Sequence, residues 1–295
     1  MRDAFSQCHP IVNFIFYIGA IVMGMCFLHP AFLCCSLCLS FAYYATIKKE
    51  RLRYLLGMSG LFAALSLVNP LFSPYGDTVL FVYLGDRPYT LEALSYGMVL
   101  AAMFVTVLTW FATYNQVMTS DKFLYCFGRL APSVSLLLTM ALRMVPLFQK
   151  RSEQIRGARK CIGKSIESGS TYEKAEHGMV IVSALTSWAL EGGIVMADSM
   201  RSRGLGSGKR TSFSIYRMEA RDKRLLCGMA VLLLAVFVCA VCGGMKASYI
   251  PQLEIAGENQ IETWIGVVCY FLFLSIPTAM NLMEELTWHI LRSRM

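Results

Sequence analysis

Residues 93–120 read ALSYGMVLAAMFVTVLTWFATYNQVMTS, a run of 28 residues without a charged side chain. A transmembrane helix needs roughly 17–25 predominantly apolar residues, so this run is long enough to cross a bilayer. The sequence predicts an all-α integral membrane protein with about six transmembrane helices, because the chain holds five further uncharged runs of similar length, at residues 11–28, 31–47, 54–72, 225–245 and 263–281.

The composition agrees with a membrane protein. Of the 295 residues, 56% are hydrophobic and only 16% are charged, whereas a soluble domain carries about 25% charged residues. The formal net charge is +8. In a membrane protein such an excess indicates cytoplasmic loops before it indicates nucleic acid, so we expect a lipid bilayer and no nucleic acid as partner.

The basic residues also predict an orientation. With the N-terminus in the cytoplasm and the six runs alternating in direction, only Arg87 and Lys246 of the 27 Lys and Arg lie outside. The positive-inside rule favours this arrangement strongly over its opposite. We therefore expect a multi-pass protein with both termini in the cytoplasm.

The middle of the chain has a different pattern. Residues 130–142 and 178–190 are uncharged but too short to cross a bilayer, and each run leads directly into basic sequence. We expect two long amphipathic helices, at residues 132–164 and from a capping box at residues 170–173 to a stop at Gly204. The predicted organisation is a four-span block at 1–118, a cytoplasmic region at 119–222 and a two-span block at 223–295.

The two long helices are expected to cross. The second helix carries the small residues Gly192, Gly193 and Ala197, which allow close approach of another helix. Glu191, the one acid in its apolar part, either pairs with an arginine such as Arg143 or is solvated. In the outer segment at 73–92, the apolar residues either form a hairpin around Gly85 and Asp86 or lie on the membrane surface.

Nothing in the sequence predicts catalysis, a metal site or a bound cofactor. Arg203 stands where a phosphate-binding loop ending at Lys209 would need glycine, and no two of the four histidines have ligand spacing. The cysteine pairs lie within apolar runs without a nearby histidine, which favours packing over metal binding or redox chemistry.

The basic helix ends remain to be explained. Contact with anionic lipid accounts for cations near the membrane. It does not account for an arginine followed at once by a glycine at a helix end, as in Arg203-Gly204. An arginine there can hold a carboxylate through two parallel hydrogen bonds. We therefore favour docking of this end into a cytoplasmic partner over lipid contact.

Three stretches resemble the transmembrane T component of energy-coupling factor (ECF) transporters. Arg143 and Pro146 match the Arg-x-x-Pro start of the family's first coupling-helix region, and Ser202-Arg203-Gly204 matches the x-Arg-Gly signature of the second. In the first copy this signature falls on Cys161-Ile162-Gly163, where isoleucine replaces arginine; either Arg159 substitutes for it or that contact is apolar. The stretches are FSQCHPIVNFIFYIGAIVMGMCFLHP at 5–30, ALRMVPLFQKRSEQIRGARKCIG at 141–163 and MADSMRSRGLGSGKRTSF at 196–213.

The resemblance implies a coupling subunit of the prokaryotic plasma membrane, not an enzyme. Two cytoplasmic ABC-type ATPases would bind the ATP, and a membrane-embedded S component would bind a vitamin or a metal ion. Arg143 and Pro146 would lie at the helix crossing with Gly192, Gly193 and Ala197. The competing hypotheses are a membrane-embedded enzyme and an autonomous transporter, each using the basic region for lipid contact. The implied ATPase-docking residues are Arg159, Ile162, Gly163, Arg201, Ser202, Arg203 and Gly204.

Overall fold

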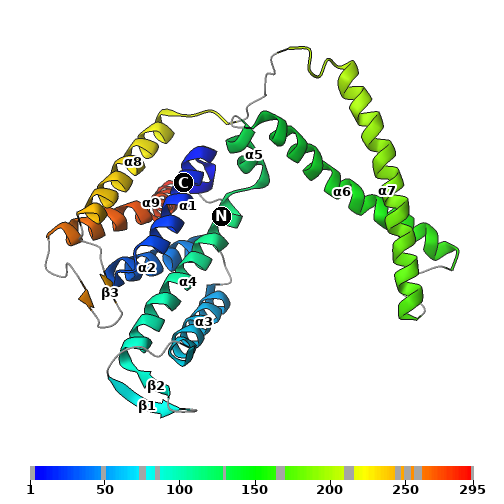
Figure 1. Ribbon diagram of the computed structural model, residues 1–295. Coiled ribbons are helices and arrows are strands. Elements are labelled where there is room, and N and C mark those ends of the chain that lie inside the picture. The colour runs from blue at the N-terminus through cyan, green and yellow to red at the C-terminus, as the bar shows by residue number, and fades with distance from the viewer. Residues whose placement is uncertain are drawn as a thin grey trace. The chain divides into compact units, whose positions relative to one another are not determined.

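The computed structural model divides the chain into two compact units. The first unit holds Met1–Phe123 and Tyr216–Met295, and the second holds Leu124–Ile215. The first unit therefore joins the two ends of the chain, drawn in blue to green and in yellow to red in Figure 1. The structure describes residues 4–47, 51–72, 78–83, 87–128, 131–163, 170–208, 216–242, 247–248, 254–255 and 261–293.

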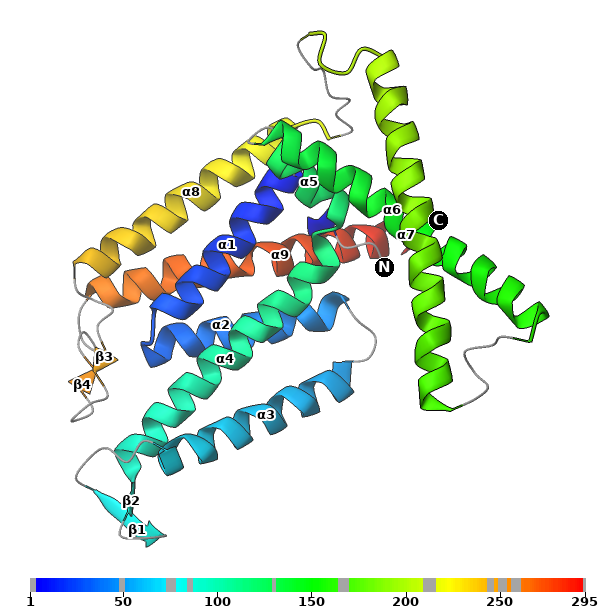
Figure 2. The same ribbon diagram turned by 45° about the vertical axis from the view of Figure 1, so that its right-hand side comes forward.

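The first unit is a bundle of helices. Helix α4 packs against α1, α2 and α3, while α9 packs against α2 and α8 (Figure 2). Helix α1 also contacts α8, so the N-terminal and C-terminal segments share one core. The bounds are η1 Phe5–Gln7, α1 Pro10–Cys26, α2 Pro30–Ile47, α3 Arg51–Phe72, α4 Leu91–Val117, α8 Ala220–Val241 and α9 Ile261–Ser293.

Two His-Pro pairs start the first two helices. His9 Nδ1 accepts a hydrogen bond from Ile11 N at 3.3 Å, and His29 Nδ1 accepts one from Ala31 N at the same distance. Proline follows each histidine at the first helical position, where its missing N–H costs nothing. The two histidines thus cap the N-terminal ends of α1 and α2.

Aromatic side chains fill the core of this bundle. Trp110 of α4 is fully buried, and its Nε1 donates to Ser36 Oγ of α2 at 3.2 Å. The ring of Phe16 packs edge-on against Trp110 and stacks on Phe273 of α9, with centroid distances of 5.5 and 5.2 Å. Three helices from distant parts of the sequence therefore meet at one aromatic cluster.

Lys122 anchors the start of α5 (Ser120–Gly128) to the N-terminal segment. Its Nζ donates to Ser6 O, to Ser6 Oγ at 3.2 Å and to Val117 O at 2.9 Å. The side chain is only 7% exposed, so this cation satisfies buried carbonyl groups. Helix α5 leads out of the first unit, and Lys122 fixes its first turn.

Short strands form two antiparallel pairs. Strands β1 (Val79–Tyr83) and β2 (Arg87–Thr90) pair with Tyr83 opposite Arg87, so the segment expected on the outer side contains a hairpin. Of the two alternatives for this segment, the structure shows the hairpin; Gly85 and Asp86 lie outside the described residues. Strands β3 (Ala247–Ser248) and β4 (Glu254–Ile255) form the second pair.

The second unit consists mainly of two long helices. Helix α6 (Pro132–Cys161) has 30 residues and α7 (Thr171–Ser202) has 32. The expected capping box starts α7, because Glu173 N donates to Ser170 Oγ at 3.4 Å and Ser170 N donates to Glu173 Oε2 at 2.7 Å. Helix α6 ends three residues before the expected position 164.

The chain is an all-α integral membrane protein, as the sequence predicts. Seven of the described helices are long and apolar enough to cross a membrane, namely α2, α3, α4, α6, α7, α8 and α9. This set of seven differs in two ways from the six transmembrane helices expected from the sequence. Helix α1 has only 17 residues, and α6 and α7 qualify because each continues past its short uncharged run.

Candidate functional site

The end of α7 is a complete glycine-terminated helix cap. Gly204 has a φ of +84°, and its N–H donates to Arg201 O at 2.9 Å. Leu205 N donates to Met200 O at 3.0 Å. These two bonds define a Schellman motif, in which Arg203 is the last residue before the chain turns back. The sequence prediction that α7 stops at Gly204 is confirmed.

The end of α6 shares the positive-φ glycine and the first of these two bonds. Ile162 is the capping residue, and Gly163 follows with a φ of +76°. Gly163 N donates to Lys160 O at 3.1 Å, as Gly204 N does to Arg201 O. We call residues 161–163 the α6 tip and residues 202–204 the α7 tip. At both tips the helix ends abruptly, because a glycine at positive φ turns the chain away from the helix axis.

The two tips differ in chemistry. Arg201, Ser202 and Arg203 are all exposed, and no ion pair to either arginine is found among the residues that the structure describes. The carbonyl ends of the helix favour such cations through the helix dipole. At the α6 tip the corresponding side chain is that of Ile162, which is 68% exposed. One tip therefore presents a cation and the other an apolar group.

Arg159 does not extend freely from the α6 tip. Its Nη2 lies 3.0 Å from His177 Nδ1 of α7, and the residue is half-buried between the two helices. Of the docking residues proposed from the sequence, Arg159 alone makes a described contact with the other long helix. Of the remaining six, five lie at the two tips, and Arg201 lies in the last turn of α7 directly before its tip.

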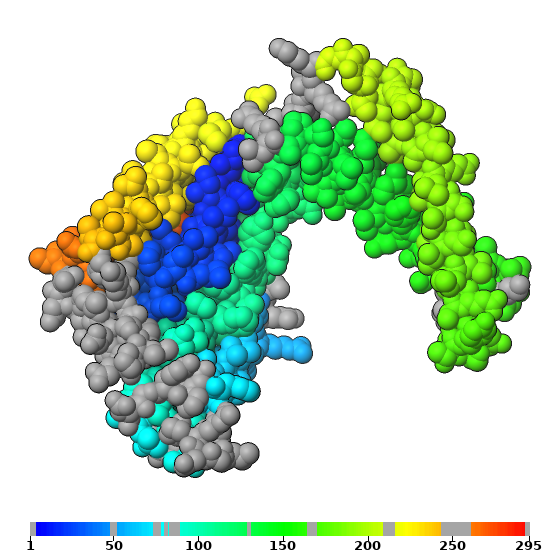
Figure 3. Space-filling view, in the orientation of Figure 1, coloured from blue at the N-terminus to red at the C-terminus, as the bar shows by residue number. Residues whose placement is uncertain are grey.

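The observed contacts between α6 and α7 involve aromatic residues that the sequence reasoning missed. Phe148 packs edge-on against Trp188 at 5.8 Å between ring centroids, and the guanidinium of Arg151 lies 5.7 Å from the Trp188 ring. Figure 3 shows the two helices, green and yellow-green, meeting along part of their lengths. The sequence did contain a signal for this contact, because Phe148 and Trp188 are large aromatic residues on the two helices that were expected to cross.

The predicted crossing residues are not among those that make this contact. A Cβ on Gly192 or Gly193 would meet no other atom within 4 Å, so neither glycine marks a close approach in this chain. Ala197 is half-buried, whereas Arg143 and Pro146 are exposed. The crossing uses large side chains instead of small ones, so the backbones need not approach closely at the glycines.

Glu191 and Arg143 are both exposed, and no ion pair joins them. The structure therefore does not show the pairing of Glu191 with Arg143, and solvation of this carboxylate stays a prediction.

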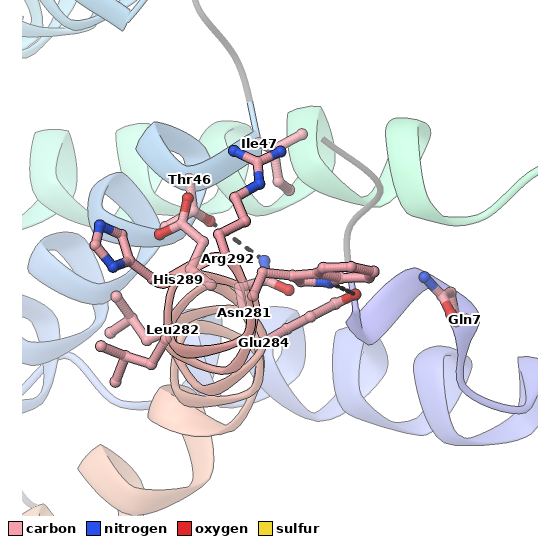
Figure 4. A pocket seen from close by; sticks show the side chains of 11 residues that line it. Gln7, Thr46, Ile47, Asn281, Leu282, Glu284, His289 and Arg292 are labelled. Carbon is pink, nitrogen blue, oxygen red and sulfur yellow. Dashed lines mark hydrogen bonds between the residues drawn. The ribbon is translucent and has the colours of Figure 1, made fainter. Parts of the chain in front are cut away.

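The first unit also contains a groove of about 880 Å³ at the end of α9 (Figure 4). Asn281 Nδ2 donates to Thr46 Oγ1 and Trp288 Nε1 donates to Glu284 Oε1, both at 3.4 Å. Among the described residues no cluster of three or more His, Cys, Asp or Glu side chains could hold a metal ion. The groove is lined by Gln7, Thr46, Ile47, Asn281, Leu282, Glu284, Glu285, Leu286, Trp288, His289 and Arg292.

Comparison with known proteins gives one informative match. The chain is 28% identical over 213 residues to the energy-coupling factor transporter transmembrane protein EcfT of Listeria innocua. This match covers 66% of the chain and 79% of the relative. It confirms the resemblance to the EcfT family. No family model matches the sequence.

The EcfT resemblance and the apolar helices together make the chain a multi-pass membrane protein with a role in transport. The two tips are the features of the described structure that set it apart from a plain bundle of membrane helices. They are therefore the candidate site of this EcfT-like protein.

Proposed function

We propose that this chain is the transmembrane coupling (T) subunit of an ECF-type ABC importer. In this role it transmits the ATP-driven motion of two cytoplasmic ATPases to a membrane-embedded S component that binds a vitamin or a metal ion. The chain itself is not an enzyme and binds no cofactor, because the partner ATPases bind the ATP. Its place is the plasma membrane of a prokaryote, with both termini in the cytoplasm.

The observation that carries this proposal is the exposed Arg203 at the end of α7. The Schellman motif fixes the chain direction after Arg203, so the arginine stands at a blunt helix end. A planar guanidinium binds a carboxylate through two parallel hydrogen bonds. An acidic groove on an ATPase would complement it, and a rigid helix would carry the movement of that groove toward the membrane.

The apolar surface of α7 supports the second partner. Val182, Leu190, Ile194 and Val195 are large apolar side chains that remain at least half exposed in the isolated chain. A surface of this kind on a long helix needs lipid or another membrane protein to cover it. Under the proposed function, the S component covers this apolar surface of α7.

The test is the substitution Arg203→Glu in cells that also contain the ATPases and the S component. Removal of one member of a buried charge pair costs about 2–5 kcal/mol, and a reversed charge adds repulsion. We expect the ATPases to be lost from the purified complex and uptake to fail, with the chain still in the membrane. Arg217→Glu, at an exposed arginine before α8, is the matched control and should retain both.

Two results would contradict this function. Retained ATPases and normal uptake in Arg203→Glu would remove the docking role. Equal loss in Arg203→Glu and Arg217→Glu would indicate general attraction to anionic lipid, which is the competing explanation for the basic region.

A further inference from the structure

Arg159 is held between α6 and α7. Its Nη2 lies 3.0 Å from His177 Nδ1, across a separation of 18 residues in sequence. Its Nε atom is buried without a hydrogen-bond partner among the described residues. An arginine that serves a protein partner would keep its donors accessible, whereas this guanidinium is partly enclosed by the helix pair.

The chemistry of the contact fixes the direction of the hydrogen bond. Arginine has five N–H donors and no acceptor, so Arg159 donates and His177 Nδ1 accepts. The imidazole is then neutral, with its proton on Nε2. The bond connects the last turn of α6 with the second turn of α7 and so fixes the two helices next to their connection.

A second contact fixes the same pair further along. Phe148 and Arg151 both pack on Trp188. Phe148 precedes Arg159 by eleven residues, and Trp188 follows His177 by eleven residues. Each interval corresponds to about 16 Å of helix, so the two contacts lie at matching positions on antiparallel helices. One contact alone would allow the helices to pivot, whereas two contacts define their crossing.

We propose that Arg159 is a positioning residue, which sets the crossing of α6 and α7 through His177 and does not bind an ATPase. This inference rests on the proposed function for its consequence in transport, but the contact itself does not. It resolves the role of Arg159 at the first copy of the signature, because the guanidinium is engaged within the chain. The exposed side chain at the α6 tip is then Ile162.

The experiment measures amide hydrogen exchange in the purified full-length chain, without ATPases. The variants are Arg159→Gln, His177→Ala and their combination. Loss of the net contribution of one intramolecular hydrogen bond should accelerate exchange in the first two turns of α7 about threefold to tenfold. Because both single variants remove the same bond, the double variant should add nothing further.

Two additional variants make the test specific. Arg159→Glu combined with His177→Lys replaces the hydrogen bond with an oppositely charged pair between the same two positions, which should return exchange and uptake toward wild type. Arg156→Gln removes an exposed arginine one turn earlier in α6 and should change neither. Failure of the restored pair together with additive effects of the two single variants would overturn the proposal.

ATPase retention separates this inference from the proposed function. Under the proposal, Arg159→Gln lowers uptake while the ATPases stay bound. Unchanged exchange in Arg159→Gln with loss of the ATPases, as expected for Arg203→Glu, would make Arg159 a docking residue and overturn the proposal. If the wild-type chain binds no ATPase, the proposed function fails, and the exchange result still decides the role of Arg159.

Discussion

Ile162 and Arg203 occupy equivalent positions at the ends of α6 and α7. Each is the capping residue of its helix, and each directly precedes a glycine in the left-handed region, with φ of +76° at Gly163 and +84° at Gly204. The same backbone therefore presents an apolar side chain at one tip and a cation at the other. Under the proposed function, the two ATPase contacts of this protein depend on different forces, and only the α7 contact should weaken with added salt.

The glycine at the α7 tip should resist substitution. An alanine in the left-handed region costs roughly 1–2 kcal/mol, and a Cβ on Gly204 would also lie 3.0 Å from Ser207 Oγ. We expect Gly204→Ala to weaken ATPase retention about fivefold or more. Gly208→Ala is the control, because a Cβ there meets nothing within 4 Å. Equal retention in the two variants would show that the sharp turn after Arg203 is not needed.

Gly97 of α4 permits the close packing of α3. A Cβ at this position would lie 2.9 Å from the backbone oxygen of Ser66, which cannot move away as a flexible side chain can. We expect Gly97→Ala to lower the thermal unfolding midpoint of the purified protein, followed by circular dichroism, because overpacking costs about 1–3 kcal/mol.

The matched control for Gly97 is Gly60→Ala in α3, where a Cβ meets no atom within 4 Å and alanine favours the helix. The midpoint of this variant should stay the same or rise. A midpoint for Gly97→Ala as high as that for Gly60→Ala would contradict the packing of α3 on α4.

Lys122 should be necessary for the stability of the first unit. The substitution Lys122→Met leaves the carbonyls of Ser6 and Val117 without their shared donor, at a cost of about 2 kcal/mol or more. We expect a lower unfolding midpoint and faster proteolysis of the N-terminal segment. Lys150→Met removes an exposed lysine on α6 and should have little effect. Comparable stability of the two variants would disprove the anchoring role.

Trp110 should contribute far more to the stability of the first unit than an exposed tryptophan does. In Trp110→Phe the hydrogen bond to Ser36 is lost and the aromatic cluster gains a void, which together cost about 1–3 kcal/mol. Trp264→Phe changes a side chain that is 62% exposed, so its midpoint should match wild type. The comparison tests whether the cluster around Trp110 holds α1, α2 and α9 together. Equal unfolding midpoints for Trp110→Phe and Trp264→Phe would contradict this role.

Features set by neighbouring residues could be predicted from the sequence. The start of α7 follows from Ser170 and Glu173, and its end follows from Gly204, because each depends on bonds within a few residues. The membrane class follows from uncharged runs, since bilayer thickness dictates helix length. Hydrogen bonds between neighbouring residues and the thickness of the bilayer are sufficient to predict the ends of α7 and the membrane class.

Features that join distant segments could not be predicted in this way. Ser36 and Trp110 are 74 residues apart, and Lys122 reaches Ser6 across 116 residues. Hydropathy identifies membrane helices but does not say which polar side chain each neighbour will satisfy. The contact between α6 and α7 is a further example. Small residues indicated where helices can approach, whereas Phe148 and Trp188 determine where α6 and α7 meet.

Under the proposed function, the position of Trp188 would let the last part of α7 act as a lever arm. Fourteen residues lie beyond it up to Ser202, an arm of about 21 Å. Turning the helix by about 10° about the Trp188 contact would sweep that end through roughly 4 Å. A modest rearrangement at one tryptophan is thereby amplified into a displacement larger than the diameter of a water molecule.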